Sequence, residues 1–353
     1  MSRADTAGSG ERMKVVVTRN LGPDVMPLLQ ERKELDLVVW PEDRPCEREW
    51  FLQNVPGATG VIVMLSDKVN QELYEAAGPT LKIVSTMSVG YEHIDLQGAA
   101  QRNIRVGYTP DVLTDAVADI SIMLALMAGR NVRETTELVA RGDWPNTAWA
   151  PYGFVGPQLS ANWVHPTRTA GFLGFGRISK ATLARLVPFG FTDCVYTSNP
   201  SSTPNPAADA ETARTYGLRS VRRVGLPELA AQSDVVFVLA PGGAATHHVV
   251  DAAFLRGMKS TAVLVNTARG TLVDSDALAT ALRERWIWGA GVDVVEGEPH
   301  VGREHPLVRE PRCVVLPHIA SATIETRLGM ATTAAKNLLG ALFGEAMPAE
   351  VQM

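Results

Sequence analysis

Short apolar runs recur about every 20 positions along the first hundred residues, and segments with helical spacing lie between them. The apolar runs cover residues 14–18, 35–40, 60–64, 82–86 and 104–106, and helical character is found at 24–32 and 70–77. Strands that alternate with helices are typical of a parallel sheet with helices on both faces. This part of the chain therefore predicts one small α/β domain.

The same rhythm returns after a long apolar helix, which is predicted over 114–129 with Thr114 or Asp115 as its cap. A run rich in Pro, Ser and Asn at 198–210 predicts a loop. Because 353 residues exceed the size of most single cores, we expect an α/β fold with two doubly wound parallel-sheet domains. Strands of the second domain are expected at 170–173, 193–197, 235–239, 262–266, 289–294 and 313–316, and a final helix at 322–343.

Residues 141–168 break this rhythm, because large aromatic side chains lie there among prolines and glycines. They are Trp144, Trp149, Tyr152, Phe154 and Trp163. So many large aromatic groups in a loop need a surface to pack on, and that surface belongs either to their own domain or to a second subunit.

The stretch 169–190 carries the first chemical signal, a short apolar run followed by a turn through Gly174 and Gly176 and then a helical repeat. This order is typical of the opening of a dinucleotide-binding βαβ unit. A diphosphate must approach the free N–H groups at the helix N-terminus, and a Cβ at either glycine would hold it off. Ser179 replaces the third glycine of the fingerprint, whose role in helix–strand packing a small hydroxyl residue tolerates. The apolar positions of the helix are Ile178, Ala181, Ala184 and Leu186 or Val187.

Three further stretches place polar residues where strands end. Arg269 lies in VNTARG, Glu298 in AGVDVVEGEP and His318 in LPHIASAT, and each stretch begins as a predicted strand. Open α/β sheets bind ligands beyond the carboxyl ends of their strands, so we expect these side chains to meet in one crevice.

An Arg, a Glu and a His beside a nicotinamide form a coherent set for the reduction of a 2-keto acid. Arg269 would hold the carboxylate and polarise the carbonyl, because a guanidinium directs two donors onto neighbouring oxygens. His318 would donate a proton to the oxygen as hydride reaches carbon. Glu298, paired with the imidazole, would stabilise its charged form.

The segments VGYTPDVLTDAVAD, GFLGFGRIS, NTARG, AGVDVVEGEP and LPHIASAT follow one another in family order, so that the chain resembles the D-isomer-specific 2-hydroxyacid dehydrogenases over nearly its whole length. STMSVGYEHIDL and NLLGALFGEAMPAE are most similar to eukaryotic glyoxylate/hydroxypyruvate reductases. The resemblance implies reduction of glyoxylate and hydroxypyruvate to glycolate and D-glycerate. The catalytic trio of the family matches Arg269, Glu298 and His318.

The resemblance also assigns binding roles. The substrate-binding set is Val89, Gly90, Arg269 and Ser321, with the backbone N–H groups of the first two facing the acid. Asp293 matches the residue that contacts the nicotinamide carboxamide. The cofactor-binding set is Thr114, Gly174, Gly176, Arg177, Ile178, Ser198, Asn199, Ala240, Pro241, Thr267 and Asp293.

A discontinuous domain organisation follows from the same resemblance. It implies a flavodoxin-like substrate domain made of 13–114 and 321–353, and a Rossmann dinucleotide domain at 115–320. The aromatic segment 141–168 becomes a dimerisation arm, which predicts a homodimer. Residues 1–12 are polar and predict a disordered tail.

Cofactor choice is predicted from the end of the strand at 193–197. Enzymes that use NAD usually place Asp or Glu there to bind the ribose 2′-OH, but this chain has Ser198 and Asn199, and no carboxylate before Asp209. Arg222 or Arg223 could reach in from the end of the next strand. We therefore expect NADPH to be preferred, with NADH possible.

Composition excludes several other classes. A net charge of −5 without any basic run argues against nucleic acid, and no apolar stretch is long enough to span a membrane. Three scattered cysteines suit a reducing compartment, so the cytoplasm is expected. The pair His247–His248 has no third ligand in view in the sequence, so no metal is expected.

Two alternatives stay open from the sequence. The first is another member of the family, such as a phosphoglycerate, D-lactate, formate or phosphite dehydrogenase. The second is a non-enzymatic NAD-sensing corepressor of the same fold, which would be expected to carry a long disordered tail and a peptide-binding cleft.

Overall fold

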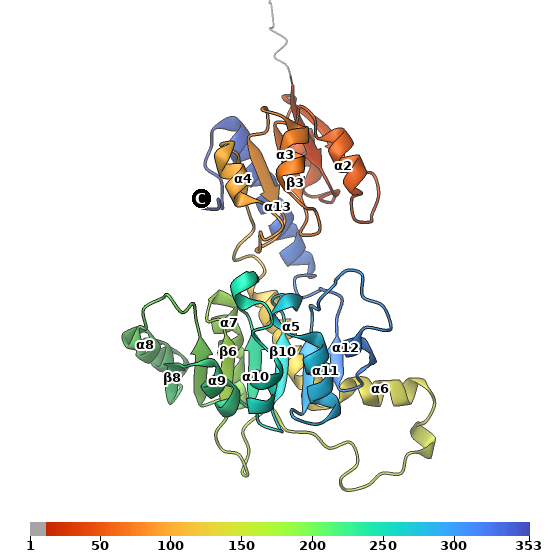
Figure 1. Ribbon diagram of the computed structural model, residues 1–353, viewed down its shortest axis with the longest axis vertical. Helices are drawn as coiled ribbons and strands as arrows, with labels where there is room; N and C mark the ends of the chain where they lie inside the picture. Colours follow the sequence, from red (N-terminus) through yellow and green to blue (C-terminus); the bar gives the residue numbers. More distant parts are fainter. Residues whose placement is uncertain (1–11) are drawn as a thin grey trace, which may run out of the picture. The chain divides into compact units, whose positions relative to one another are not determined.

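The computed structural model describes residues 12–353, which divide into two compact units (Figure 1). One unit combines the described chain up to Leu113 with Thr323–Met353, and the other is Thr114–Ala322. The expected disordered tail at 1–12 lies, except for its last residue, outside the described residues. Two parallel sheets confirm the expected α/β class.

The first unit is built on a five-stranded parallel sheet with the strand order β2-β1-β3-β4-β5. All five predicted strands are present, and their bounds differ from the expected ones by at most one residue. The strands are β1 (Met13–Val17), β2 (Leu35–Val39), β3 (Gly60–Val63), β4 (Ile83–Thr86) and β5 (Arg105–Gly107).

Helices cover both faces of this sheet because successive strand residues point to opposite sides. Val16 packs with the residues of one face, and its neighbours Val15 and Val17 pack with those of the other. One face is covered by α2 (Arg48–Asn54), α3 (Gln71–Ala77) and α4 (Leu96–Gln101), and the other by α1 (Met26–Gln30) and α13 (Ile324–Phe343).

The helix α13 returns to the first unit from the far end of the chain. Besides its apolar packing, it accepts a hydrogen bond at the carbonyl of Ala334 from the buried Ser85 hydroxyl, at 2.8 Å. The buried Asn337 amide donates to the carbonyl of Tyr108 at 2.9 Å. Both bonds satisfy groups that burial would otherwise leave without a partner.

The second unit is built on a seven-stranded parallel sheet with the strand order β12-β11-β10-β9-β6-β7-β8. Six of these strands match predicted ones. The apolar pattern did not predict the bounds of the edge strand β8, which has the sequence SVRR. The strands are β6 (Thr169–Leu173), β7 (Asp193–Thr197), β8 (Ser220–Arg223), β9 (Val235–Val238), β10 (Val263–Asn266), β11 (Gly289–Val292) and β12 (Cys313–Val315).

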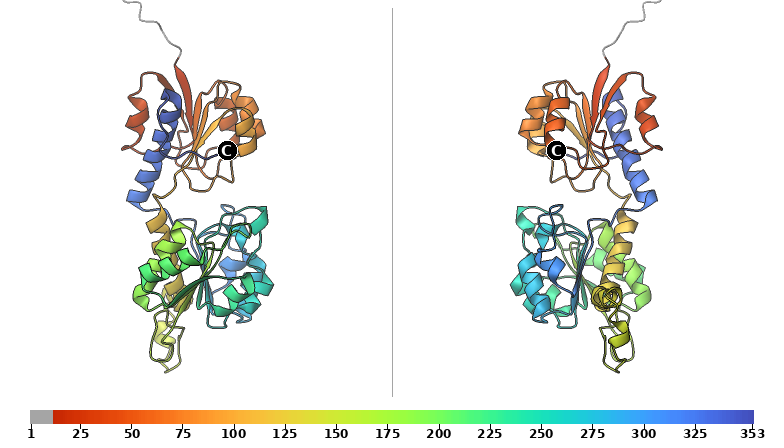
Figure 2. Two further views of the ribbon diagram at one scale, coloured as in Figure 1. Left: turned by 90° about the vertical axis from the view of Figure 1, so that its left-hand side faces the viewer. Right: turned by 90° about the vertical axis from the view of Figure 1, so that its right-hand side faces the viewer.

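This sheet is also covered on both faces, as its edge-on views show (Figure 2). Along β9, Val236 and Val238 belong to one buried cluster, and Val235 and Phe237 to the other. The first face carries α9 (Leu226–Gln232), α10 (Ala252–Gly257) and α11 (Ser275–Arg283), and the second carries α5 (Thr114–Gly129) and α7 (Arg177–Leu186).

One predicted loop is partly wrong, because the helix α8 (Pro206–Tyr216) begins inside the range 198–210. The Asn205 side chain accepts a hydrogen bond from the backbone N–H of Ala208 at 3.1 Å, which caps the helix. Pro206 then occupies the first helical position, where its fixed φ suits a helix and its missing N–H has no cost. The Pro- and Asn-rich composition that predicted a loop therefore also marks the start of a helix.

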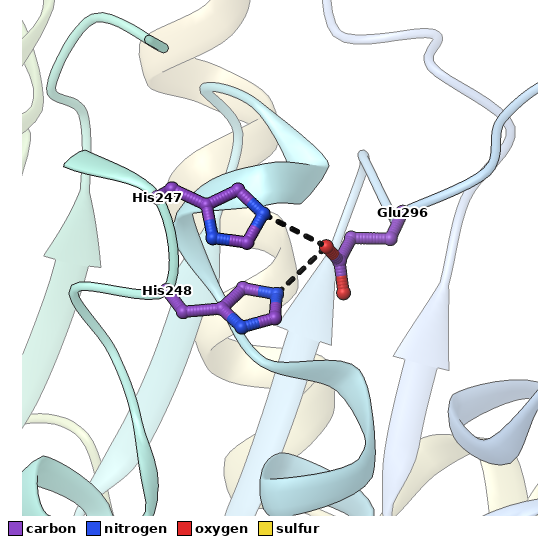
Figure 3. Close-up of side chains that lie close together, drawn as sticks. All are labelled: His247, His248 and Glu296. Atoms are coloured by element: carbon purple, nitrogen blue, oxygen red, sulfur yellow. Dashed lines mark hydrogen bonds and ion pairs between the residues drawn. The ribbon is translucent and has the colours of Figure 1, made fainter. Parts of the chain in front are cut away.

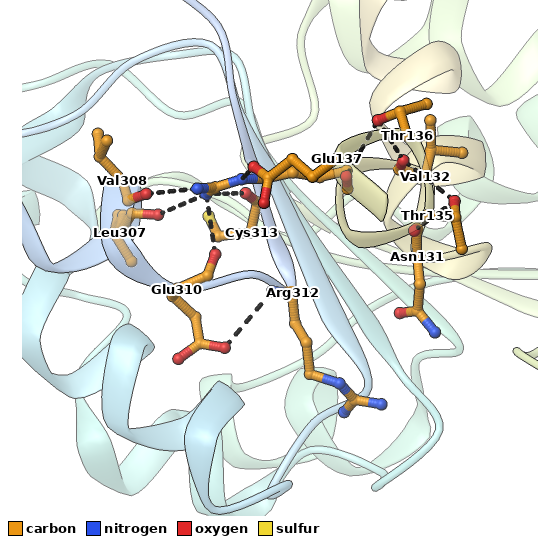
Figure 4. Close-up of polar contacts among 11 residues, drawn as sticks. Asn131, Val132, Thr135, Thr136, Glu137, Leu307, Val308, Glu310, Arg312 and Cys313 are labelled. Carbon is orange, nitrogen blue, oxygen red and sulfur yellow. Dashed lines mark hydrogen bonds and ion pairs between the residues drawn. The ribbon is translucent and has the colours of Figure 1, made fainter. Parts of the chain in front are cut away.

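A short helix, α6 (Val132–Ala140), leads into the aromatic segment 141–168. Its Arg133 guanidinium donates to four carbonyls around α12 (Pro306–Arg309), at 2.5–3.4 Å (Figure 4). These bonds fasten the root of the segment to the β12 edge of the sheet. The segment itself contains one short 3-10 turn, η1 (Trp144–Asn146), as its regular structure.

Within residues 12–353, no helix combines the length and hydropathy that crossing a membrane requires.

Candidate functional site

The carboxyl ends of the strands in the second unit lie level with one another. Leu173 at the end of β6 is in register with Thr197 of β7 on one side and Val238 of β9 on the other. Asn266 of β10 is in register with Val238 and with Val292 of β11. The residues that follow these strands therefore share one edge of the sheet. The strand order also reverses between β6 and β9, which is where open α/β sheets bind ligands.

The turn after β6 depends on Gly174, whose φ is +89°. A Cβ at this position would lie 2.8 Å from the Cα of Ala240, so only glycine fits. The hydroxyl of Ser179 donates to the carbonyl of Gly174 at 2.8 Å and so holds the turn closed against α7. The position of the third fingerprint glycine thus carries a side chain that supports the turn.

The N-terminus of α7 remains open beyond this turn. Gly176 is the residue before the helix, and no atom lies within 4 Å of where its Cβ would stand. Arg177 and Ile178 are the first two helical residues, and α7 is ten residues long. Free N–H groups and the helix dipole at such an end suit a diphosphate, so the cradle fits a dinucleotide.

Other predicted cofactor residues line the same edge. Ala240 and Pro241 follow β9. Thr267 follows β10, and its buried hydroxyl lies 2.9 Å from that of Ser121 on α5. Thr114 is the first residue of α5.

The end of β7 carries a compact polar turn. Ser198 lies 3.2 Å from the Ser202 hydroxyl, which itself donates to the carbonyl of Asn199 at 2.7 Å. From the end of the neighbouring strand β8, the Arg223 guanidinium donates to the carbonyls of Asn199 at 2.9 Å and Ser202 at 2.6 Å. Arg222 instead pairs with Glu228 at 3.0 Å. A positive charge therefore lies against this turn, and Arg223 supplies it.

The first carboxylate after β7 is already engaged. Asp209 on α8 accepts a hydrogen bond from the Tyr196 hydroxyl at 2.6 Å. Burial, followed by this bond to a carboxylate, raises the pKa of the Tyr196 hydroxyl well above its ordinary value. Asp209 therefore holds the side chain of Tyr196, the residue just before the end of β7.

The loop that carries Arg269 is shaped by the preceding strand end. The buried Asn266 side chain donates to the carbonyl of Arg269 at 2.9 Å and accepts the N–H of Ala268 at 3.0 Å. A Cβ at Gly270 would lie 2.1 Å from the carbonyl carbon of Val295, so the two backbones are in direct contact. The loop of Arg269 is therefore packed on the turn that leads to Glu298.

His318 and Glu298 form the central pair of the site. The Nδ1 atom of His318 lies 2.8 Å from Oε1 of Glu298, and both side chains are partly buried. The other carboxylate oxygen of Glu298 accepts the backbone N–H of Val295 at 3.2 Å. His318 has a φ of +56°, a conformation that non-glycine residues adopt rarely and often at functional sites.

Asp293 holds the loop of His318 in place. Its two carboxylate oxygens accept the backbone N–H groups of Ile319 and Ala320, each at 2.8 Å, and its carbonyl accepts the N–H of His318 at 2.9 Å. Burial raises the pKa of the Asp293 carboxyl, and the two backbone donors oppose that rise. Asp293 therefore positions the histidine, a role that its place in the sequence did not reveal. Ser321 lies three residues after the histidine and is partly buried.

Val89 and Gly90 belong to the first unit, in the loop after β4. The buried Ser88 hydroxyl donates to the carbonyl of Gly90 at 2.7 Å and lies 2.8 Å from the Thr86 hydroxyl. Thr86 also lies 3.0 Å from Nε2 of His93. These bonds fix the shape of the loop.

A further group lies beside the turn of Glu298. His247 and His248, in the segment after β9, meet the carboxylate of Glu296. The sequence did not reveal this meeting, because the residues come from two loops far apart along the chain.

The sequence of this chain is similar to those of D-isomer specific 2-hydroxyacid dehydrogenases. Residues 122–320 match the sequence pattern described as D-isomer specific 2-hydroxyacid dehydrogenase, NAD binding domain. The human protein glyoxylate reductase/hydroxypyruvate reductase is 40% identical over 97% of this chain and 98% of its own length.

Solved structures agree with this over the whole fold. A protein of Thermus thermophilus is 36% identical, with a TM-score of 0.83 over 96% of this chain and 100% of that one. The NADPH-dependent glyoxylate/hydroxypyruvate reductase of Sinorhizobium meliloti, solved with NADP and malonate, is 31% identical, with a TM-score of 0.76 over 96% of this chain and 97% of that one.

Proposed function

Because the chain belongs to the D-isomer specific 2-hydroxyacid dehydrogenase family, we propose that it reduces glyoxylate and hydroxypyruvate to glycolate and D-glycerate. It is an NAD(P)-dependent oxidoreductase similar over nearly its full length to glyoxylate/hydroxypyruvate reductases. The observation that carries the proposal is the 2.8 Å pair of His318 and Glu298 beside the loop of Arg269.

The residues divide the chemistry among themselves. The reduced nicotinamide supplies the hydride. Arg269 holds the carboxylate of the substrate and polarises its 2-keto group, while His318 donates a proton to the oxygen that becomes the hydroxyl. Glu298 engages Nδ1 of the imidazole, so that Nε2 is the nitrogen that serves the substrate, and its negative charge stabilises the protonated ring.

Binding roles follow the division into two units. The first unit is the proposed substrate domain, where the N–H groups of Val89 and Gly90 bind the carboxylate. The second is the proposed dinucleotide domain, with the diphosphate at the N-terminus of α7. Ser321 contributes a hydroxyl to the substrate, and Asp293 holds the histidine loop and contacts the carboxamide.

NADPH is the proposed preferred cofactor, and NADH is a weaker alternative. The turn that follows β7 offers the hydroxyl of Ser198 and the amide of Asn199 to a 2′-phosphate, and it has no carboxylate to repel it. Arg223 supports the proposal, since its guanidinium contacts this turn and has five donors for two carbonyls. The strand β8 therefore places one basic residue, Arg223, next to Asn199.

A homodimer is the proposed assembly, formed through the arm at 141–168. Trp149 and Trp163 are 89% and 93% exposed, and Tyr152 is 88% exposed. Large apolar groups exposed together mark an association surface, and a two-fold interface covers both copies at once. The three cysteines, all free, support the cytoplasm as the proposed compartment.

Steady-state kinetics tests the proposal directly. We expect kcat/KM for glyoxylate and hydroxypyruvate to exceed that for pyruvate, and to exceed that for phenylpyruvate by more. A preference for phenylpyruvate would contradict the small-substrate proposal, and no turnover of any 2-keto acid with either cofactor would contradict the reductase activity.

A further inference from the structure

Two imidazoles and one carboxylate converge beside the turn that carries Glu298. Nε2 of His248 lies 2.7 Å from Oε1 of Glu296, and Nε2 of His247 lies 3.8 Å from the same oxygen (Figure 3). The two rings are stacked with their centroids 3.9 Å apart. One ligand atom of each residue lies within 4.8 Å of the other two, so both histidines face one carboxylate oxygen.

The backbone holds this arrangement firmly. His248 has a φ of +50°, and its N–H donates to the carbonyl of Thr271 at 2.8 Å. Two residues on, Val250 pairs with Val273 in an isolated bridge. The histidine segment is therefore fixed to the loop after Arg269, and the Glu296 backbone lies directly against Gly270 of the same loop. His247, His248 and Glu296 therefore lie on segments that contact the same loop, the one that follows Arg269.

We propose that His247, His248 and Glu296 bind a divalent cation of the Zn²⁺ class. Zinc bonds of about 2.0–2.2 Å to nitrogen and oxygen in a tetrahedron place the ligand atoms about 3.3–3.5 Å apart. The separations of 2.7 Å and 3.8 Å from Oε1 of Glu296 lie on either side of this value, so binding would lengthen the first by about 0.7 Å and shorten the second by about 0.4 Å. Two imidazoles and a carboxylate leave the fourth position to water.

Asp274 lies close to the second ring nitrogen of His248, although too far from it for a hydrogen bond. Its Oδ2 atom lies 4.0 Å from Nδ1 of His248, the ring nitrogen that faces away from Glu296. Metal-binding histidines usually direct their second nitrogen to a carboxylate, which fixes the tautomer and strengthens the bond. The other oxygen of Asp274 is held by the N–H of Ala277 at 2.9 Å, so this carboxylate is already oriented.

The site is separate from the catalytic pair but shares its turn. Glu296 lies two residues before Glu298, and the N–H of Val295 donates to the Glu298 carboxylate. A bound cation would join this turn to the histidine segment without occupying Glu298 or His318. We therefore expect the cation to stabilise the fold.

Metal binding by the full-length protein, stripped with a chelator, tests the proposal. Titration calorimetry with ZnCl₂ should give one equivalent per chain, and Co²⁺ should develop the visible absorption of a four-coordinate site, which Zn²⁺ removes. At a zinc concentration about 100-fold above Kd, the melting temperature should rise by roughly 5–10 °C.

Three variants distinguish this site from other zinc-binding groups. His247→Ala and Glu296→Gln should each lose the cobalt spectrum and the rise in melting temperature, and His165→Ala should keep both. His247 is exposed, so its variant remains informative if Glu296→Gln fails to fold. Binding that is absent from the native protein, or that survives unchanged in His247→Ala, would overturn the proposal.

Discussion

Nδ1 of His318 and Oε1 of Glu298 stand 2.8 Å apart, although 20 residues separate them along the chain. The pair is held from both sides. Asp293 fixes the loop of the histidine through two backbone N–H groups, and the N–H of Val295 fixes the second oxygen of the glutamate. A ring held in this way presents Nε2 in one orientation, which proton transfer requires.

Replacing His318 tests the proton donor. His318→Ala should lower kcat by roughly 10²–10⁴, the usual contribution of acid–base catalysis, and should leave the Kd of NADPH nearly unchanged. Stopped-flow single turnovers and fluorescence titration of the cofactor measure the two quantities. His300→Ala is the control, because this exposed histidine lies in the turn after Glu298 and should turn over normally. Full activity in His318→Ala would refute the assignment.

Arg223 tests the origin of cofactor preference. Arg223→Ala should lower kcat/KM for NADPH by roughly 10–100-fold and change that for NADH little, because a charge-assisted bond contributes about 1.5–3 kcal/mol. Arg222→Ala is the matched control, since Arg222 pairs with Glu228 and Gln232 instead. Ser198→Asp should shift the preference toward NADH. Equal losses in the two arginine variants would show that general charge, and not the contact of Arg223, sets the preference.

The aromatic arm tests the assembly. Burial of a large aromatic side chain contributes about 1.5–3 kcal/mol, so charges at Trp149 and Trp163 should weaken a dimer strongly. Sedimentation velocity at micromolar concentration should give a dimer for the native protein and a monomer for Trp149→Glu/Trp163→Glu. Leu65→Glu changes an exposed apolar residue of the first unit and should leave the dimer intact. A native protein that sediments as a monomer would disprove the proposed assembly.

The bidentate pair of Arg105 and Glu350 tests how the end of the chain is held. Two bonds of 2.8 Å and 2.6 Å join β5 to Glu350, and the bond to Arg105 lowers the pKa of that carboxyl below its ordinary 4.5. Since the pair is about one third exposed, Glu350→Gln should lower the free energy of unfolding by only about 0.5–1 kcal/mol at pH 7.

This contribution has a definite pH dependence. A carboxyl whose pKa is lower in the folded state stabilises fully above its unfolded value, and the stabilisation is lost as pH falls through the folded value. Urea unfolding should therefore show the two proteins converging below about pH 4. The exposed Glu345 provides the control, and Glu345→Gln should match the native protein both at pH 7 and below about pH 4. A difference that persists in acid would mean that the charge is not responsible.

The sheets were predictable because a central parallel strand is buried on both faces and reads as a continuous apolar run. The run VVFV of β9 is an example. The edge strand β8 carries the exposed Arg222 and the partly buried Arg223, which interrupt the apolar run by which a central strand is recognised. The ends of strands were predictable for the same reason, so the positions of Arg269, Glu298 and His318 after β10, β11 and β12 could be predicted from the sequence.

Side chains that turn inward against the apolar pattern were not predictable. On α7 the pattern indicated Ile178, Ala181, Ala184 and Leu186 or Val187. Leu186 is indeed buried, but the pattern did not indicate the buried Ser179 and Thr182. Both hydroxyls donate to nearby backbone carbonyls, which removes the cost of burial. The meeting of His247, His248 and Glu296 depends on how two loops leave their strands, and no local pattern records it.

The return of α13 to the first unit determines the order in which the protein can fold during synthesis. Thr114–Ala322 is continuous and can fold as soon as it leaves the ribosome, but one face of the first sheet has only α1 to cover it until α13 emerges. At about 5–20 residues per second, the stretch 114–353 takes roughly 10–50 s to synthesise. During that interval Ile62 of β3 and Ile83 of β4, the strands on which α13 packs, lack this cover, so we expect the first unit to be the more aggregation-prone part of the nascent chain.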